Sequence, residues 1–361
     1  MNPIRLLVDS FADQGLQNAQ MANAREIICR LDSSLFHVSV FCVGNPDPRI
    51  AQRPNTRLIR LPKRRQTVRI AREFLLGRHE IVFYLKSSPA SRYYMSLRNK
   101  WRDQRVVVGT VESQADLRNE PTISPAAVHL WEQTILRCDY LFSNSSAVQK
   151  SLQREYQLPS AVIPTGVDIN FFVPGADEKQ NVCLRVLFVG SLRPFKGPQL
   201  VLEAAKRFPC ATFALAGEGI MAEELKSCVR REKLLNVELL GPLDAEQLRR
   251  EYQRADIFLF PSRWEGSPKV ILEAAACGLP VIARKDYEPE TVIDGQTGYL
   301  ARSDGEIFQR LDHLLQNASL RCAFGAAGRK HSEPFDWDVI ARQWEHAFVD
   351  LIALRGCRRA A

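Results

Sequence analysis

Apolar residues follow two spacings along this chain. Short runs of Val, Ile, Leu and Phe alternate with longer stretches in which apolar residues recur at every third or fourth position. The short runs are typical of strands buried on both faces, and the longer stretches are typical of helices. Strands and helices in alternation predict a parallel sheet with helices on both faces, and therefore an α/β fold.

The alternation occurs twice, which together with a length of 361 residues predicts two domains. Residues 173–181 carry turn formers and charges in place of apolar residues and are typical of a linker. The predicted domains are 1–172 and 183–335, joined by the linker 173–182. In the first, strands are expected at 4–9, 37–43, 56–61, 81–85, 105–111, 140–143 and 161–164, and helices at 18–31, 66–76, 91–101, 125–137 and 146–155. In the second, strands are expected at 185–189, 212–216, 237–240, 257–260 and 281–283, and helices at 198–207, 222–232, 245–254, 268–277 and 305–316.

A last helix is expected at 336–354, within the tail 336–361. Its apolar residues recur at steps of three and four and form one stripe: Trp337, Ile340, Trp344, Phe348 and Leu351. The stripe packs either on the second domain or, by crossing back, on the first. The pattern leaves both arrangements open.

Composition excludes several classes of protein. No stretch approaches the roughly 20 uncharged apolar residues of a membrane-spanning helix, and Asp9 interrupts the first apolar run before it reaches the length of a signal peptide. A cytoplasmic protein is therefore expected. Nine cysteines and six histidines are dispersed without the C-x-x-C or H-x-x-x-H spacing of metal ligands. We expect no metal site and interpret the cysteines as buried thiols.

The net charge of +8 is concentrated in the first domain, between residues 57 and 105. Between 57 and 78 the single acid Glu73 accompanies eight cations, and between 92 and 105 the single acid Asp103 accompanies five: Arg57, Arg60, Lys63, Arg64, Arg65, Arg69, Arg72 and Arg78, then Arg92, Arg98, Lys100, Arg102 and Arg105. Apolar residues such as Val68 and Phe74 lie among them. Three interpretations of this region stay open. It contacts the inner face of an anionic membrane peripherally, it binds a polyanionic acceptor, or it is a solvated surface. Nucleic acid is not an expected partner, because no recognition motif accompanies the charge.

The most informative segment is 261–280. It reads as a strand end, a loop, and a helix with Ser267 as its cap, Pro268 at its first position and Gly278 at its close. This pattern of loop and capping residues does not explain why a glutamate, Glu265, lies in the loop. Loops at the carboxyl ends of parallel strands border the ligand crevice of such folds, and a helix N-terminus there attracts phosphate. Glu273, two turns further along, can accept two hydrogen bonds from a ribose diol. The segment therefore predicts a nucleotide-diphosphate site.

A second segment, 189–197, also follows a strand and precedes a helix. Its cations Arg193 and Lys196 can neutralise a departing diphosphate without a metal ion, or they are solvated loop charges. Trp264, next to Glu265, is either a packing residue or a platform for a sugar ring. These two choices stay open at the level of sequence.

Seven ordered segments resemble motifs of the family 4 retaining glycosyltransferases of the GT-B fold, also called glycosyltransferase group 1. The similarity is strong over about 163–301 and weaker before it. Glu265 and Glu273 match the E-x7-E motif of that family. The matching segments are 163–168, 190–197, 216–219, 240–241, 255–262, 265–280 and 294–300.

This resemblance implies two Rossmann-like parallel-sheet domains that face a central cleft, and it implies roles for individual residues. Glu273 would bind the ribose, Glu265 the donor sugar or its surroundings, and Lys196 the charge of the departing nucleotide. Gly15 would let the backbone approach the donor. The remaining donor-binding positions that the resemblance implies are Gly190, Gly217, Gly266, Ser267, Pro268, Lys269 and Val270.

The chain departs from the pattern of that family at three places. Ser191 stands where the family has arginine, and Arg193 follows two residues later. Glu112 stands where many members have a cleft histidine. The Gly-Gly before the family's loop glutamate, here Glu290, is replaced by the segment 286–288, Asp-Tyr-Glu. With Glu265 and Lys196, Arg193 and Glu112 complete the candidate catalytic set.

The function that the resemblance implies is retaining transfer of a sugar from a UDP- or GDP-linked donor to a glycan, lipid-linked or small-molecule acceptor. The donor is a co-substrate, and no further cofactor is expected. The donor phosphate can itself take the acceptor proton. Alternatives are a catalytically idle homologue that binds the donor as a partner subunit, and a nucleotide-sugar epimerase or phosphorylase on the same fold.

Overall fold

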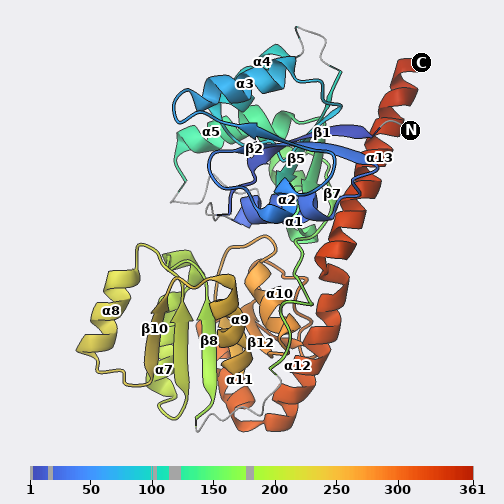
Figure 1. The fold of residues 1–361 in the computed structure, drawn as a ribbon. Helices are drawn as coiled ribbons and strands as arrows, with labels where there is room; N and C mark the ends of the chain where they lie inside the picture. Colours follow the sequence, from blue (N-terminus) through green and yellow to red (C-terminus); the bar gives the residue numbers. More distant parts are fainter. Residues whose placement is uncertain are drawn as a thin grey trace. The chain divides into compact units, whose positions relative to one another are not determined.

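The computed structural model describes residues 3–14, 19–98, 100, 104–113, 123–175 and 183–360. The chain forms two compact units (Figure 1). The first contains Met1–Pro164 together with Trp337–Ala361, and the second contains Thr165–Asp336. Each unit is built around one parallel sheet, which confirms the predicted α/β class with two Rossmann-like units.

The sheet of the first unit has the order β3-β2-β1-β4-β5-β6-β7, and all its pairs are parallel. The chain runs outward from β1 to β3 and then returns to add β4 on the other side of β1. The loops after β1 and β4 therefore diverge, which opens a crevice at the carboxyl ends of these strands. The strands are β1 (Ile4–Phe11), β2 (Phe36–Cys42), β3 (Thr56–Arg60), β4 (Ile81–Phe83), β5 (Val106–Val111), β6 (Tyr140–Ser143) and β7 (Ala161–Val162).

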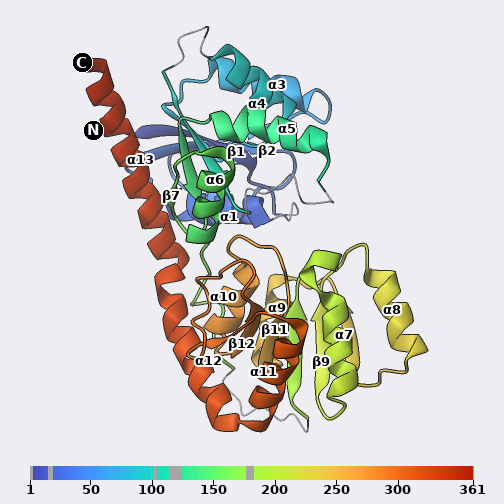
Figure 2. The same ribbon diagram turned by 180° about the vertical axis from the view of Figure 1, so that it is seen from behind.

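Helices cover both faces of this sheet. Alternate residues of β1 point to opposite faces, Leu6 and Val8 into one buried cluster and Leu7 into the other. The first cluster includes α1 and α13, and the second includes α3, α4 and α6 (Figures 1 and 2). The helices of this unit are α1 (Ala19–Arg30), α2 (Pro48–Ala51), α3 (Gln66–Leu76), α4 (Pro89–Leu97), α5 (Pro125–Thr134), α6 (Ser146–Tyr156) and α13 (Trp337–Ala360).

The C-terminal helix α13 packs on the first unit, so the arrangement in which it crosses back is the one observed. Its predicted stripe is buried, and the ring of Trp344 lies 4.6 Å from that of Phe83 and 4.8 Å from that of Phe142. Phe348 adds edge contacts with Phe36 and Phe83. Among the described helices, none combines the length and the apolar composition needed to cross a bilayer.

The sheet of the second unit has the order β10-β9-β8-β11-β12-β13, again with parallel pairs throughout. The direction of strand addition reverses here between β8 and β11. Its strands are β8 (Arg185–Val189), β9 (Thr212–Ala216), β10 (Val237–Gly241), β11 (Ile257–Phe260), β12 (Val281–Arg284) and β13 (Gly298–Ala301). Its helices are α7 (Pro198–Arg207), α8 (Ala222–Arg231), α9 (Ala245–Arg254), α10 (Lys269–Ala276), α11 (Asp304–Gln316) and α12 (Ala318–Ser332).

Two elements of the second unit, β13 and α12, are absent from the sequence-based expectation. Glycines lower the helix propensity of α12. In the structure they are required by close packing, because a Cβ on Gly325 would lie 2.1 Å from the carbonyl oxygen of Gly278. Close packing against Gly278 thus explains why α12 contains glycine despite its low helix propensity.

The boundary between the units lies at Pro164 and Thr165, ahead of the expected boundary at 172, and residues 176–182 of the expected linker lie outside the described residues. The segment 165–172 belongs to the second unit for a physical reason. Phe172 is buried against Tyr252, with ring centroids 5.8 Å apart, and Arg329 donates a hydrogen bond to the Phe172 carbonyl at 2.6 Å. The two chain crossings lie side by side, since the Val167 amide donates to the Phe335 carbonyl at 2.8 Å.

The interpretation of the cysteines as buried thiols is only partly right. Cys42 and Cys277 are buried, but Cys183, Cys210 and Cys322 are exposed. Cys183 and Cys210 lie outside the helices and strands, and Cys322 lies on an outward-facing position of α12, so none of the three contributes to a core.

Candidate functional site

The switch point of the second sheet brings the two predicted segments together. The loop 190–197 follows β8 and the loop 261–268 follows β11, and these strands are neighbours. The Arg263 amide donates to the Phe195 carbonyl at 2.9 Å, and the Ser262 hydroxyl donates to the same oxygen at 3.4 Å. Backbone contacts thus hold the two loops at the crevice where α/β folds bind ligands.

Lys196 and Glu265 form an ion pair that joins these two loops. The Lys196 Nζ donates to Glu265 Oε1, and the Ser262 hydroxyl donates to the same oxygen at 2.6 Å. The side chains are 18% and 12% exposed. The Lys196 ammonium group also lies 5.4 Å from the ring centroids of Phe195 and Phe260. Both side chains therefore have defined positions, and each stays partly exposed.

Tyr287 lies next to this pair and was missed by the sequence-based selection. Its side chain is fully buried, and its hydroxyl has no hydrogen-bond partner among the described residues. Burial raises the pKa of Tyr287 well above its usual value, and the negative charges of Glu265 and Asp286 raise it further. The only signal in the sequence was the departure at 286–288, which puts this phenol where the family resemblance implies glycine.

Glu273 is anchored by Tyr252. Its Oε2 accepts a hydrogen bond from the hydroxyl of the fully buried Tyr252 at 3.0 Å. Burial raises the pKa of Glu273, and the charge of Lys269 and the Tyr252 hydroxyl offset only part of that rise. Oε1 forms no hydrogen bond with a described residue, so the carboxylate still offers an acceptor oxygen.

Helix α10 begins one residue later than expected. Pro268, with φ of −72° and ψ of 114°, is the cap, and Lys269 is the first helical residue. The expectation of a Ser267 cap with Pro268 inside the helix was therefore wrong. The Pro268 carbonyl accepts the first bond, from the Ile271 amide at 3.2 Å, as a capping residue does. No side chain caps this N-terminus, and Gly278 ends the helix at a φ of 77°, as predicted.

The consequence for anion binding is a smaller set of donors. Proline has no N–H, so Pro268 shapes the loop without donating a bond. The amides of Gly266, Ser267, Lys269 and Val270 are the members of the predicted set that can donate. Gly266 is buried, whereas Ser267, Lys269 and Val270 are half-buried.

Close backbone packing explains the glycines of this edge. A Cβ on Gly217 would lie 1.9 Å from the Gly190 carbonyl oxygen, and Gly217 has a φ of 136°. A Cβ on Gly197, with φ of 71°, would lie 2.9 Å from the Pro261 carbonyl oxygen. The glycines allow the loops after β8, β9 and β11 to touch. Donor contact by Gly190 and Gly217 stays a prediction.

Arg193 and Trp264, the other selected residues of the two loops, do not join the hydrogen-bond network of Lys196, Glu265 and Ser262. Arg193 is exposed and forms no ion pair with a described residue, unlike Lys196. Trp264 packs edge-on against Phe195, with ring centroids 6.0 Å apart, which favours the packing interpretation.

Arg284 is a second cation near these loops, in addition to Lys196, and sequence analysis did not select it. It lies buried at the carboxyl end of β12, donates to the Pro261 carbonyl at 3.2 Å and pairs with Asp286 at 3.5 Å. Burial lowers its pKa, and the charge of Arg263 lowers it further. An arginine at the end of an apolar strand was the available signal.

The first unit carries its own polar group, at the carboxyl end of β5. Glu112 accepts hydrogen bonds from the hydroxyl of the buried Tyr84 and from Asn23 Nδ2, the latter at 3.3 Å. Burial raises the pKa of Tyr84, as does the neighbouring Glu112. Tyr84 and Glu112 line a cavity of about 350 Å³ that is also lined by Lys86 and Ser87. Gly15, expected near this edge, lies outside the described residues.

Lys86 and Asp9 are ionisable residues of this edge that sequence analysis did not select. The Lys86 amide donates to Asp9 Oδ2 at 2.8 Å, and the Lys86 Nζ lies 4.4 Å from the Phe11 ring centroid. That Nζ is buried and forms no hydrogen bond with a described residue. Burial raises the pKa of Asp9 to about 6, although Lys86 opposes the shift, and burial lowers the pKa of Lys86. The first sheet thus presents a polar, ionisable cavity at its switch point.

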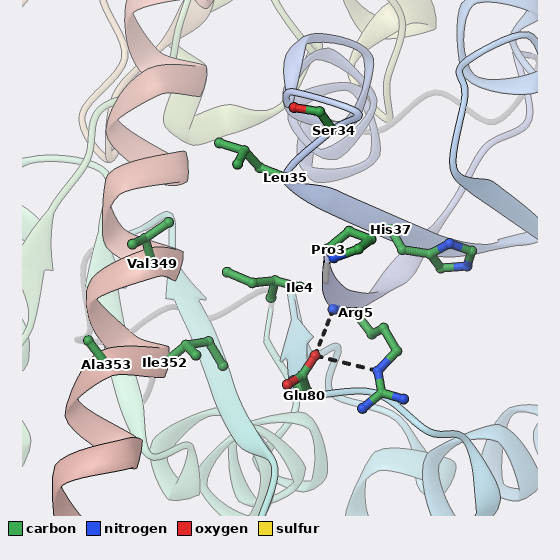
Figure 3. A pocket seen from close by; sticks show the side chains of 10 residues that line it. All are labelled: Pro3, Ile4, Arg5, Ser34, Leu35, His37, Glu80, Val349, Ile352 and Ala353. Carbon is green, nitrogen blue, oxygen red and sulfur yellow. Dashed lines mark hydrogen bonds and ion pairs between the residues drawn. The ribbon is translucent and has the colours of Figure 1, made fainter. Parts of the chain in front are cut away.

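A different hollow lies at the amino ends of β1 and β2 (Figure 3). Its volume is about 850 Å³, and Ile4, Leu35, Val349 and Ile352 give it an apolar lining. Glu80 sits at its rim and accepts a bond from the Arg5 amide at 3.1 Å. It belongs to the opposite end of the strands from Glu112 and Lys86.

Comparison with known proteins agrees with this arrangement. A family model described as glycosyl transferases group 1 matches residues 167–331, nearly all of the second unit. A D-inositol 3-phosphate glycosyltransferase of Corynebacterium diphtheriae is 30% identical over 250 residues, which cover 62% of this chain and 58% of that protein. A GDP-mannose-dependent phosphatidylinositol monomannoside mannosyltransferase of Mycolicibacterium smegmatis is 31% identical over 231 residues, covering 56% of this chain and 58% of that protein. The chain thus matches little more than half the length of these relatives.

Solved structures extend the similarity to the whole fold. Sucrose-phosphate synthase from Thermosynechococcus elongatus has a TM-score of 0.80 at 20% identity and covers 98% of this chain and 100% of its own. HepE from Anabaena, solved in complex with UDP-glucose, has a TM-score of 0.76 at 18% identity and covers 96% and 100%. At these identities the likeness concerns the fold alone. With the two parallel sheets and the matched second unit, it leads to one assignment: the chain has the GT-B fold, and its second unit matches the glycosyltransferase group 1 family.

Proposed function

We propose that the protein transfers a sugar from a nucleoside-diphosphate sugar to an acceptor hydroxyl, with retention of the anomeric configuration, and that its second unit holds the donor. The observation that carries this proposal is the ion pair of Lys196 with Glu265 beside the uncapped N-terminus of α10. The proposal is supported by a structural neighbour that was solved with UDP-glucose and by a relative whose name specifies GDP-mannose. The proposal covers both UDP-linked and GDP-linked donors.

The donor is placed by chemical complementarity. Its diphosphate lies at the start of α10, where the amides of Lys269 and Val270 and the positive end of the helix favour negative charge. Its ribose diol donates to the carboxylate of Glu273, whose Oε2 is oriented by Tyr252. Its sugar lies toward Glu265.

Lys196 carries the electrostatic part of the reaction. When the bond between the anomeric carbon and the phosphate oxygen breaks, negative charge grows on the leaving diphosphate. A preoriented cation lowers the free energy of that transition state. Glu265, which itself accepts a hydrogen bond from Ser262, holds Lys196 in place before the donor arrives, so little reorganisation is needed.

Retention follows from attack on the face that the leaving group vacates. The acceptor oxygen forms the new bond to the anomeric carbon, and its proton passes to an oxygen of the departing phosphate. The step needs no protein base. We assign Glu112 to orientation of a hydroxyl group at the cavity of the first unit, where Tyr84 and Asn23 hold its carboxylate.

The test is incubation of the purified protein with UDP-, GDP- and ADP-sugars, following thermal stability and release of the nucleoside diphosphate. We expect one donor class to raise the melting temperature and to be hydrolysed slowly when no acceptor is present. A Glu265→Gln variant is the control for turnover. Binding without any turnover, even with candidate acceptors, would favour the idle donor-binding homologue. No melting shift with any donor would refute the donor site.

A further inference from the structure

The outer side of α3 in the first unit carries a stripe of basic and apolar residues. Val68, Arg69, Arg72 and Leu76 share one side of the helix, and Arg65 precedes it as the capping residue. Arg69 is half-buried, and the other four are exposed. Val68 is 64% exposed and Leu76 is 69% exposed, which is unusual for aliphatic side chains on a helix that also buries Phe74. The stripe therefore has no function in the core of the unit.

The two described acids of this region, Glu73 and Glu80, are paired with cations, and Asp103 lies outside the described residues. Glu73, on the same helix, is buried and accepts hydrogen bonds from Arg57 and His79, each at 2.9 Å. Glu80 is paired with Arg5. By contrast, the cations Lys63, Arg64, Arg65, Arg69, Arg72 and Arg92 form no ion pair with a described residue. What reaches solvent is positive charge with apolar groups, and this excludes a surface of mixed, mutually neutralising charges.

Helix α4 continues the same face. It packs beside α3 on one side of the sheet (Figures 1 and 2). Tyr93 on α4 is 54% exposed, next to the exposed Arg92. These two residues border a hollow of about 450 Å³ that also contains Arg137. A tyrosine with one apolar and one polar end suits the boundary between water and lipid.

We propose that this basic and apolar face, formed by Lys63, Arg64, Arg65, Val68, Arg69, Arg72, Leu76, Arg92 and Tyr93, binds the surface of an anionic lipid bilayer. The unpaired cations are attracted to anionic headgroups, and Val68, Leu76 and Tyr93 enter the interfacial region. A soluble polyanion would engage the cations but would gain nothing from two exposed aliphatic side chains. The proposal does not depend on the donor reaction.

Sedimentation with lipid vesicles tests the proposal. Vesicles of phosphatidylcholine alone are compared with vesicles that contain about a third phosphatidylglycerol. We expect binding only to the anionic vesicles, weakening as salt is added. An Arg69→Gln/Arg72→Gln variant should bind them on the order of 30-fold more weakly, at roughly fivefold per cation. A Val68→Ser/Leu76→Ser variant should also bind more weakly, although its charge is unchanged.

A matched control removes the same charge elsewhere. Arg230 and Arg231 are exposed on α8 of the second unit, and an Arg230→Gln/Arg231→Gln variant should bind anionic vesicles as the unchanged protein does. Circular dichroism and melting temperatures establish that all variants fold.

Heparin, a soluble polyanion, separates the two partner classes. If the serine variant binds vesicles normally while the Arg69/Arg72 variant loses both vesicles and heparin, the face is a polyanion site and the proposal is wrong. Equal binding to neutral and anionic vesicles, or equal losses in the α8 control, would also overturn it.

Discussion

Lys196 and Glu265 lie 69 positions apart in the sequence, and their side chains form an ion pair where the second sheet reverses its direction of growth. Each residue belongs to a different motif, one after β8 and one after β11. Their pairing couples the cation proposed to act on the leaving group to the carboxylate proposed to face the sugar. Single substitutions of either residue will therefore report on both.

Substitution of Lys196 by Met should lower kcat on the order of 10²- to 10³-fold, because the cation that offsets charge in the transition state is lost. Donor affinity should change less. Arg193→Met is the matched control, since Arg193 lies in the same loop but is exposed and unpaired with any described residue, and we expect less than about a tenfold loss. A double-mutant cycle with Glu265→Gln should be strongly non-additive. A larger loss for Arg193→Met than for Lys196→Met would transfer the role to Arg193.

Substitution of Glu273 by Gln should weaken donor binding on the order of 10- to 100-fold near neutral pH, measured by calorimetry, because a charged acceptor for the ribose diol is lost. Exposed Glu246 on α9 supplies the control, Glu246→Gln, which should bind normally. Unchanged affinity in the Glu273 variant would contradict the ribose role.

The raised pKa of Glu273 adds a pH dependence. Donor affinity should fall as the pH is lowered through this raised pKa, above the usual value of 4.5, and the Gln variant should lack this part of the decline. For stability the sign is opposite. A carboxyl with a higher pKa in the folded protein is stabilising when protonated, and this contribution is lost as the pH rises through the folded pKa. Glu273→Gln should therefore raise the free energy of unfolding at neutral pH.

Substitution of Gly217 by Ala should destabilise the second unit by about 2 kcal/mol or more, because the new Cβ would overlap the Gly190 carbonyl oxygen at a φ of 136°. Gly295→Ala is the control. Gly295 also has a positive φ, 73°, but nothing lies within 4 Å of an added Cβ, so about 1 kcal/mol of conformational strain is expected. Chemical denaturation measures both. Equal effects would show that the close approach of the two loops is unimportant.

Substitution of Trp344 by Ala should cost about 3 to 5 kcal/mol in the unfolding free energy of the first unit, since the indole fills the space between Phe83 and Phe142. Val349→Ala on the same helix should cost less than about 1 kcal/mol, because Val349 is 44% exposed. A small effect of Trp344→Ala would mean that α13 contributes little to the core of the first unit.

Sequence alone determined most of the elements and the two loops of the candidate site in the second unit. Apolar periodicity located β8, β9, β11, α7 and α9 at their observed bounds, because burial on one or both faces leaves a local pattern. The strand, loop and helix around Glu265 and Glu273 are also encoded within a short segment. A feature that is local in the chain can be recognised from the chain.

Tertiary structure decided what depends on residues distant in sequence. Lys196 pairs with Glu265, the Tyr287 hydroxyl has no partner among the described residues, and the Lys86 ammonium group is buried, all as a result of contacts between segments distant in sequence. The boundary between the units lies at Pro164 because 165–172 packs on residues far along the chain. Helix α13 belongs to the first unit because its apolar stripe packs in the core of that unit. Hydrophobic periodicity predicts that a face is buried, but the hydrophobic effect is non-directional, so the pattern does not identify the packing partner. The partner is identified only in the folded chain.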